Sequence, residues 1–259
     1  MQAGRLIRRY LPAVLCGEMR LLRRTEEPTF VASVDHMIPM SLRSERSVVV
    51  SEVPARASVA RPLFAFALSV TAALLLGVLT AYAQGWLPDE FRSLANSAGA
   101  WALVAFLLAL LSPGASIAAA SGAASLGALL LGYVVGSAAQ HATSATSVVA
   151  FWGLAALVAG PLLGLSAHWV RSRAPALSGL GVGVIAGVLI GEGVYGLTYI
   201  ADTTYPPYWV VEAVVGVAFL VAFAIRRPRR MKDTAISVLS MVATAALFLG
   251  VFGQDLIGR

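Results

Sequence analysis

Two acidic residues lie inside apolar segments of this 259-residue chain. Glu192 follows ALSGLGVGVIAGVLIG, a run without a charged residue, and Glu212 comes shortly after PPYW. An ionised carboxylate at membrane depth costs a few kcal/mol or more unless it is paired or hydrated, and such residues often mark functional sites. Glu192 is therefore a candidate for ligand binding or proton coupling, and the alternative is a neutral glutamic acid that braces two helices by hydrogen bonds.

Aromatic side chains accompany the two acids. Tyr195 and Tyr199 follow Glu192 at positions i+3 and i+7, so a helix places the acid and both phenols on one face. We predict an acidic-aromatic site for a cationic or zwitterionic ring compound, through carboxylate pairing and cation–π contact. The alternative is an interfacial belt of Trp and Tyr that anchors helix ends. The predicted ligand-binding residues are Glu192, Glu212, Tyr195, Tyr199, Trp209, Trp86 and Asp202.

Small residues recur at helical spacing just before Glu192. Gly183, Gly187 and Gly191 form a GxxxGxxxG ridge, a flat stripe on which another helix backbone can approach closely. We expect this ridge to pack against a helix of the same chain. The alternatives are a seam for a second copy, a lipid-facing groove or a surface that docks another membrane protein.

Familiar catalytic signatures do not occur in the sequence. It contains no HExxH helix, GxSxG elbow, Walker A loop or CxxC pair. We therefore expect a protein that is not an enzyme, with no catalytic residue, no metal site and no cofactor.

The composition identifies the class of protein. Hydrophobic residues make up 58% of the chain and charged residues 12%, and the mean hydropathy is +0.80. Soluble domains carry about twice that charged fraction, so the polar residues here are too few to cover a water-exposed surface. The sequence predicts a polytopic transmembrane helix bundle whose surroundings are the lipid bilayer.

Seven apolar segments are long enough, or nearly long enough, to cross a bilayer. The second is short and would span only with help from the preceding LPDEFRSLANSA. A seven-span topology with a cytoplasmic N-terminus and an external C-terminus places seventeen Lys and Arg inside and two outside. The net charge of +6 is thus a topology signal, and we expect no nucleic-acid partner. The predicted spans are 62–84, 98–112, 115–137, 147–170, 177–200, 208–226 and 234–253.

The first 57 residues differ from the rest. They mix arginines, acids and prolines with short apolar runs, and the sequence predicts a basic, disordered cytoplasmic tail for 1–57 and a transmembrane domain for 58–259. A basic amphipathic surface helix is the alternative for part of this tail. Met37 and Met40 are alternative translation starts that would shorten it.

Three blocks carry a resemblance to a known family: TAYAQGWLPDEFRSLANSAGAWALVAFLLALL, FWGLAALVAGPLLGLSAHWVRS and GVLIGEGVYGLTYIADTTYPPYW. They resemble an actinobacterial membrane family catalogued as domain of unknown function 6518, over about residues 62–253. The resemblance implies a multi-span protein of the bacterial plasma membrane and no particular activity.

The leading functional hypothesis is small-molecule binding or transport at an outward-facing site. The alternative is a structural or interaction protein that docks other membrane proteins through its glycine ridge.

Overall fold

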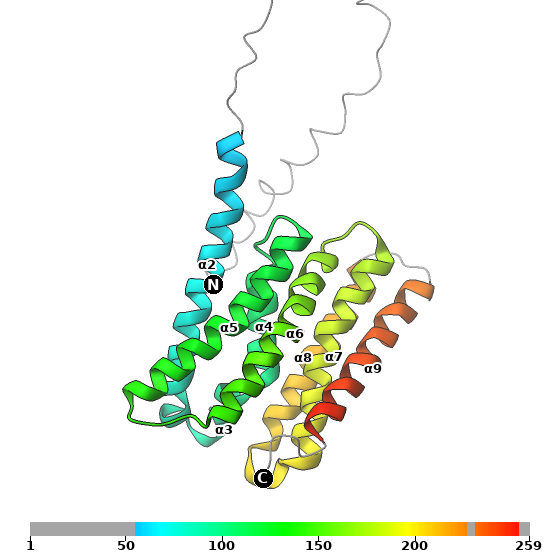
Figure 1. Cartoon of the computed structure of the whole chain (residues 1–259). Helices are drawn as coiled ribbons and strands as arrows, with labels where there is room; N and C mark the ends of the chain where they lie inside the picture. The colour runs from blue at the N-terminus through cyan, green and yellow to red at the C-terminus, as the bar shows by residue number, and fades with distance from the viewer. Residues whose placement is uncertain (1–54, 227–230, 254–259) are drawn as a thin grey trace, which may run out of the picture. The chain divides into compact units, whose positions relative to one another are not determined.

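Apolar runs broken by Pro, Gly and polar residues produce a chain of helices joined by short connections. The computed structural model describes residues 55–226 and 231–253, and every regular element within these ranges is helical (Figure 1). The predicted all-α fold is confirmed. The elements are α2 (Ala55–Trp86), α3 (Asp89–Arg92), η2 (Ser93–Asn96), α4 (Ala98–Ala109), α5 (Ala115–Ala139), α6 (Thr146–Val170), α7 (Pro175–Tyr199), η3 (Ala201–Thr203), α8 (Pro206–Arg226) and α9 (Met231–Phe252).

Within the described part of the chain, six helices are long and apolar enough to cross a membrane: α2 from Ala60, α5, α6, α7, α8 to Ile225, and α9. The second predicted span takes a different form. The segments Asp89–Asn96 and Ala98–Ala109 are bent by 58° at Ser97, and together they make up the seventh span if the bent pair counts as one. The twelve residues of α4 reach about 18 Å, much less than a hydrocarbon core of about 30 Å.

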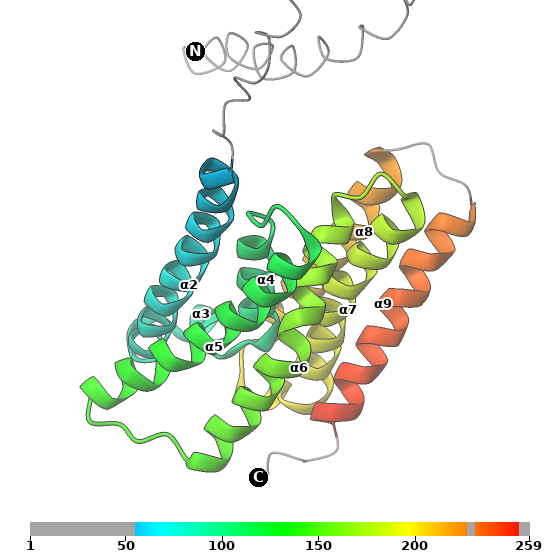
Figure 2. The ribbon, with the colours of Figure 1, turned by 45° about the horizontal axis from the view of Figure 1, so that its top comes forward.

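The helices alternate in direction, and α7 is the central one (Figure 2). It packs against α6, α8 and α9, whereas α2 packs on α5 and α5 packs on α6. Thirteen of the 25 residues of α7 are buried, and most of them are Gly, Ala or Ser. Small side chains let helix backbones approach closely, which replaces the hydrophobic driving force that is missing inside a bilayer.

Large apolar side chains cover the outside of the bundle. Leu154, Leu157 and Val158 on α6 are each more than 60% exposed, and similar residues line α2 and α9. A soluble domain would bury such a surface, so its natural surroundings are lipid tails. The chain is an integral membrane protein with several membrane-crossing helices.

Some predictions fall on residues that the structure does not describe. The tail predicted for 1–57 lies almost wholly outside the described residues, as do the alternative starts at Met37 and Met40. The connection between α8 and α9 and the last six residues are also outside them.

Candidate functional site

The site is built around the break between η2 and α4. Ser97 has an extended backbone, with φ −85° and ψ 126°, and it is the N-cap of α4. Its hydroxyl accepts a hydrogen bond from the N–H of Ala100 at 2.9 Å. The first N–H groups of a helix have no partner inside the helix and carry a partial positive charge. The break therefore places a set of free N–H donors inside the bundle.

Glu192 on α7 satisfies these donors. Its Oε1 accepts a hydrogen bond from the N–H of Ala98 at 2.8 Å, and its Oε2 accepts one from the N–H of Gly99. The hydroxyl of Ser97 lies 2.9 Å from the same Oε2. Glu192 is 5% exposed, and hydrogen bonds from a helix N-terminus favour the ionised form of a buried carboxyl group.

Glu212 on α8 meets the same hydroxyl. Its Oε1 lies 3.0 Å from Oγ of Ser97, and the side chain is 6% exposed. The second oxygen, Oε2, is buried and has no hydrogen-bond partner among the described residues. Ser97 thus joins two buried acids that are 20 positions apart in the sequence and lie on neighbouring helices.

Gly99 makes this convergence possible. A side-chain carbon at this position would overlap both Oε2 of Glu192 and Oε1 of Glu212. The absence of a Cβ therefore lets the first turn of α4 approach both carboxyl groups closely.

The other end of α4 is also capped from another helix. The guanidinium of Arg171, just after α6, donates to the carbonyl oxygens of Leu110 at 2.9 Å and Ser112 at 2.6 Å. A cation at a helix C-terminus complements the helix dipole, as an anion does at the N-terminus. Two charged residues from other helices thus hold both ends of this short helix.

A cavity of about 650 Å³ lies beside Glu192, at the end of the bundle where α7 connects to α8. Sites for small molecules commonly measure roughly 300–1,000 Å³, so this volume suits a metabolite-sized compound. Its lining comes from α3, η2, α4, α6, α7, η3, α8 and α9 and the connection before α8. The lining combines acidic with aromatic side chains, among them Glu192, Asp202, Tyr195, Trp152, Trp209 and Phe252.

Aromatic rings form much of the wall. The rings of Trp152 and Phe252 lie 5.9 Å apart, and Tyr195 lies 6.0 Å from Phe252. Trp209 is 3% exposed, and its indole N–H donates to Oγ1 of Thr204 at 2.8 Å. The indole packs on Gly196, where a Cβ would overlap the ring. The wall is therefore held by contacts among α6, α7, α8 and α9.

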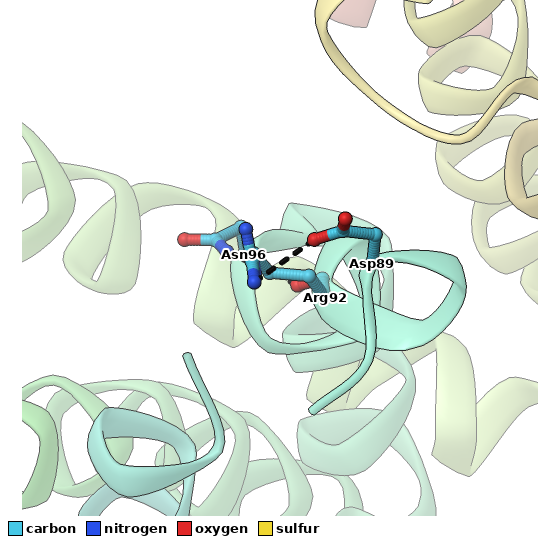
Figure 3. Close-up of polar contacts among 3 residues, drawn as sticks. All are labelled: Asp89, Arg92 and Asn96. Atoms are coloured by element: carbon cyan, nitrogen blue, oxygen red, sulfur yellow. Dashed lines mark hydrogen bonds and ion pairs between the residues drawn. The ribbon is translucent and has the colours of Figure 1, made fainter. Parts of the chain in front are cut away.

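Charged side chains lie at the rim of the cavity. Arg92 lies 2.9 Å from Asp89 within α3, in an ion pair whose two side chains are exposed, and Asn96 donates to the Arg92 carbonyl oxygen at 3.1 Å (Figure 3). Asp202 in η3 is an exposed carboxylate that also lines the cavity. Among the described residues of the lining, Arg92 is the one basic side chain, and with Asp89 as its partner the remaining charge is negative.

The structure separates the predicted site residues into two groups. Glu192, Tyr195, Trp209 and Asp202 line the cavity, and Glu212 joins them through Ser97. Tyr199 does not line the cavity; it is 52% exposed and stacks on Tyr195 at 5.3 Å. Trp86 does not line it either, since it is 72% exposed and contacts Tyr82 at the end of α2.

The glycine ridge is occupied by α9. A side-chain carbon at Gly183 would meet the Ser237 carbonyl oxygen, and one at Gly187 would meet that of Met241. Gly191 lies against the backbone of Ala245 in the same way. In this structure the ridge thus packs against a helix of the same chain.

Sequence reasoning missed several residues of the site: Ser97, Gly99, Trp152, Phe248 and Phe252. A signal existed for the first two, because Ser before a short apolar run is a typical N-cap and Gly in the first turn permits close approach. The aromatic residues of α6 and α9 are ordinary span residues in the sequence. Only the packing of the helices brings them to the cavity.

The fold and the site together define a polytopic α-helical membrane protein with a broken helix whose N-terminus binds a buried carboxylate. Residues 56–256 match the sequence model of a protein family described as "Family of unknown function (DUF6518)", and the chain belongs to this family. Comparison with curated proteins and with solved structures gave no match.

Proposed function

We propose that this protein binds a small organic cation or zwitterion in the cavity beside Glu192 and carries it across the bacterial plasma membrane. The observation that supports this most is the combination, in one cavity of about 650 Å³, of a buried carboxylate with aromatic walls. Cations bind favourably over aromatic faces and beside carboxylates, and both interactions strengthen where water is excluded.

Glu192 retains capacity for a ligand. Its Oε1 accepts one hydrogen bond, from Ala98, and a carboxylate oxygen accepts up to about two. A ligand ammonium group can therefore donate to Oε1 without displacing the contacts at the N-terminus of α4. Asp202 at the rim adds a second negative charge that attracts a cation.

The broken helix supports transport as the purpose of binding. Discontinuous helices whose ends meet at a buried site are typical of secondary transporters, where half-helices form the substrate site. Here the 58° break lies at Ser97, beside the acid that lines the cavity. The alternative function, docking of another membrane protein through the glycine ridge, requires a surface that α9 covers in this structure.

A binding experiment with matched controls tests the proposal. The full chain in lipid nanodiscs would be titrated with choline, with tetraphenylphosphonium and, as an anionic control, with benzoate, and thermal stability would be followed. We expect stabilisation by at least one of the two cations and not by benzoate. Stabilisation by benzoate alone, or by none of the three, would contradict the proposal.

Variants then locate the binding. Trp152→Leu should weaken cation binding about 2- to 30-fold, the equivalent of a cation–π contact of about 0.5–2 kcal/mol. Trp86→Leu removes the same side chain outside the cavity and should leave the affinity unchanged. Asp202→Asn should weaken binding a few-fold and less at high salt, whereas Glu90→Gln, an exposed acid outside the lining, should not. Equal effects within either pair would place the ligand elsewhere.

A further inference from the structure

Two carboxyl groups contact one serine hydroxyl, and the number of protons available for these contacts shows how they are made. Oγ of Ser97 lies 2.9 Å from Oε2 of Glu192 and 3.0 Å from Oε1 of Glu212. A serine hydroxyl has one proton, and this oxygen already accepts the N–H of Ala100. The hydroxyl can therefore donate to one of the two acids only. The other contact is a hydrogen bond only if that acid contributes a proton of its own.

The other partners show which acid carries the proton. Glu192 accepts two backbone N–H groups at the positive end of α4, and these donors stabilise its ionised form. Glu212 has no such donors among the described residues, and its buried Oε2 has no partner there. If Glu212 is protonated on Oε1, it donates to Ser97 and Ser97 donates to Glu192, so that both short contacts are hydrogen bonds.

We propose that Glu212, Ser97 and Glu192 form a proton-binding site, in which Glu212 holds one exchangeable proton while Glu192 remains ionised. A pair of buried acids in contact commonly holds a single proton, because two adjacent charges are too costly. This inference does not depend on the ligand of the cavity. It adds a chemical consequence, since Glu192 belongs to both the proton site and the cavity lining.

A metal ion is a less suitable occupant than a proton. The N–H groups of Ala98, Gly99 and Ala100 point at the oxygens of this site and repel a cation that needs oxygen ligands. In addition, the described residues hold no group of three or more His, Cys, Asp or Glu side chains that could bind a metal.

Other titratable groups face the site from the elements around it. Tyr208, one turn before Glu212 on α8, interacts with Ser97 and with both acids. The cavity lining adds Tyr195 from α7, Tyr205, and the charged rim residues Asp89, Arg92 and Asp202. The lining residues of α4, α6 and α9 are Ala98, Trp152, Phe248 and Phe252, none of which titrates. Among these groups, Glu212 combines burial with a carboxyl oxygen that has no hydrogen-bond donor among the described residues, and both features favour its protonated form.

Infrared spectroscopy tests the site without a ligand. The full chain in nanodiscs near neutral pH should show the carbonyl stretch of a protonated carboxyl group, sensitive to exchange into heavy water. Glu212→Gln should remove this band, and Glu192→Gln and the control Asp202→Asn should retain it. A wild-type spectrum without the band, or a band that survives Glu212→Gln and disappears in Glu192→Gln, would overturn the assignment.

Thermal stability provides a second, independent measurement. Glutamine at 212 imitates a protonated acid, because its amide donates to Ser97, so Glu212→Gln should melt close to the wild type. Glutamine at 192 loses one of the two oxygens that face N–H donors, so Glu192→Gln should melt at a clearly lower temperature. The opposite order would overturn the proposal. If Glu192→Gln does not fold, the loss or survival of the band in Glu212→Gln still decides it. A failed cation screen would leave both measurements unaffected.

Discussion

Glu192 on α7 accepts a hydrogen bond from the N–H of Ala98, the first residue of α4, at 2.8 Å. The two residues are 94 positions apart in the sequence, and their contact allows α4 to begin inside the bundle instead of at its surface. A helix terminus buried in a membrane protein needs partners for its free N–H groups, and here a carboxylate supplies them. This contact connects the break in the second span with the cavity.

Gly99→Ala should destabilise the protein, because the new methyl group would overlap the carboxyl oxygens of Glu192 and Glu212. We expect a loss of about 1–3 kcal/mol, the usual cost of overpacking, measured by thermal or denaturant unfolding in detergent. Gly127→Ala is the matched control, since a Cβ there meets no atom within 4 Å, and it should be neutral or slightly stabilising. Equal stability of the two variants would show that the first turn of α4 does not closely approach the acids.

Arg171→Ala should lower stability by about 1–2 kcal/mol, because the carbonyl oxygens of Leu110 and Ser112 lose a charged donor at the C-terminus of α4. Arg173→Ala removes the same charge from an exposed position two residues later and should have almost no effect. Unfolding measurements at two salt concentrations check this pair of variants. A similar loss in both would indicate that net charge, and not the cap, is responsible.

Gly183→Ala should separate α7 from α9, because its methyl group would meet the Ser237 carbonyl oxygen and the Ser240 side chain. We expect a loss of about 1–3 kcal/mol and no change of oligomeric state, measured by unfolding and by light scattering. Gly250→Ala, on the open side of α9, is the control and should be neutral. A change in oligomeric state caused by Gly183→Ala would favour the seam between copies.

Cation affinity should rise with pH if the cavity and the proton site share Glu192. A cation beside Glu192 disfavours the neighbouring proton on Glu212, so binding releases that proton, and protons in turn oppose binding. The increase should not exceed about tenfold per pH unit, the limit for one proton. Calorimetric titration of the cation found by the screen, in buffers of different ionisation enthalpy, checks this.

Glu212→Gln should abolish the pH dependence while binding persists, and Asp202→Asn should preserve the dependence at a lower affinity. If Glu212→Gln retains the full dependence, the two sites are not coupled through this acid.

Much of the candidate site is predictable from one stretch of sequence, 191–212. The two acids within apolar segments, Tyr195 and the turn with Asp202 and Trp209 all belong to it. Helix periodicity predicts that Tyr195 shares a face with Glu192, and the short connection between the two helices predicts that all these residues lie at one end of the bundle. Tyr199 and Trp86 show the limit of this reasoning. Both are aromatic residues near helix ends, yet both are largely exposed and neither lines the cavity.

The sequence by itself determined the class of protein, the all-helical fold and the near-correct bounds of the apolar helices, because hydropathy and helix period are local properties. It also marked Glu192 and Glu212 as costly where they stand. Only the tertiary structure decided that both acids converge on Ser97 and that Trp152 and Phe252 complete the wall. It also decided that α4 is a half-length helix, capped by Glu192 of α7 and by Arg171, which follows α6. These features depend on which helix faces which and at what height. That arrangement results from close packing among distant segments, and no local pattern contains it.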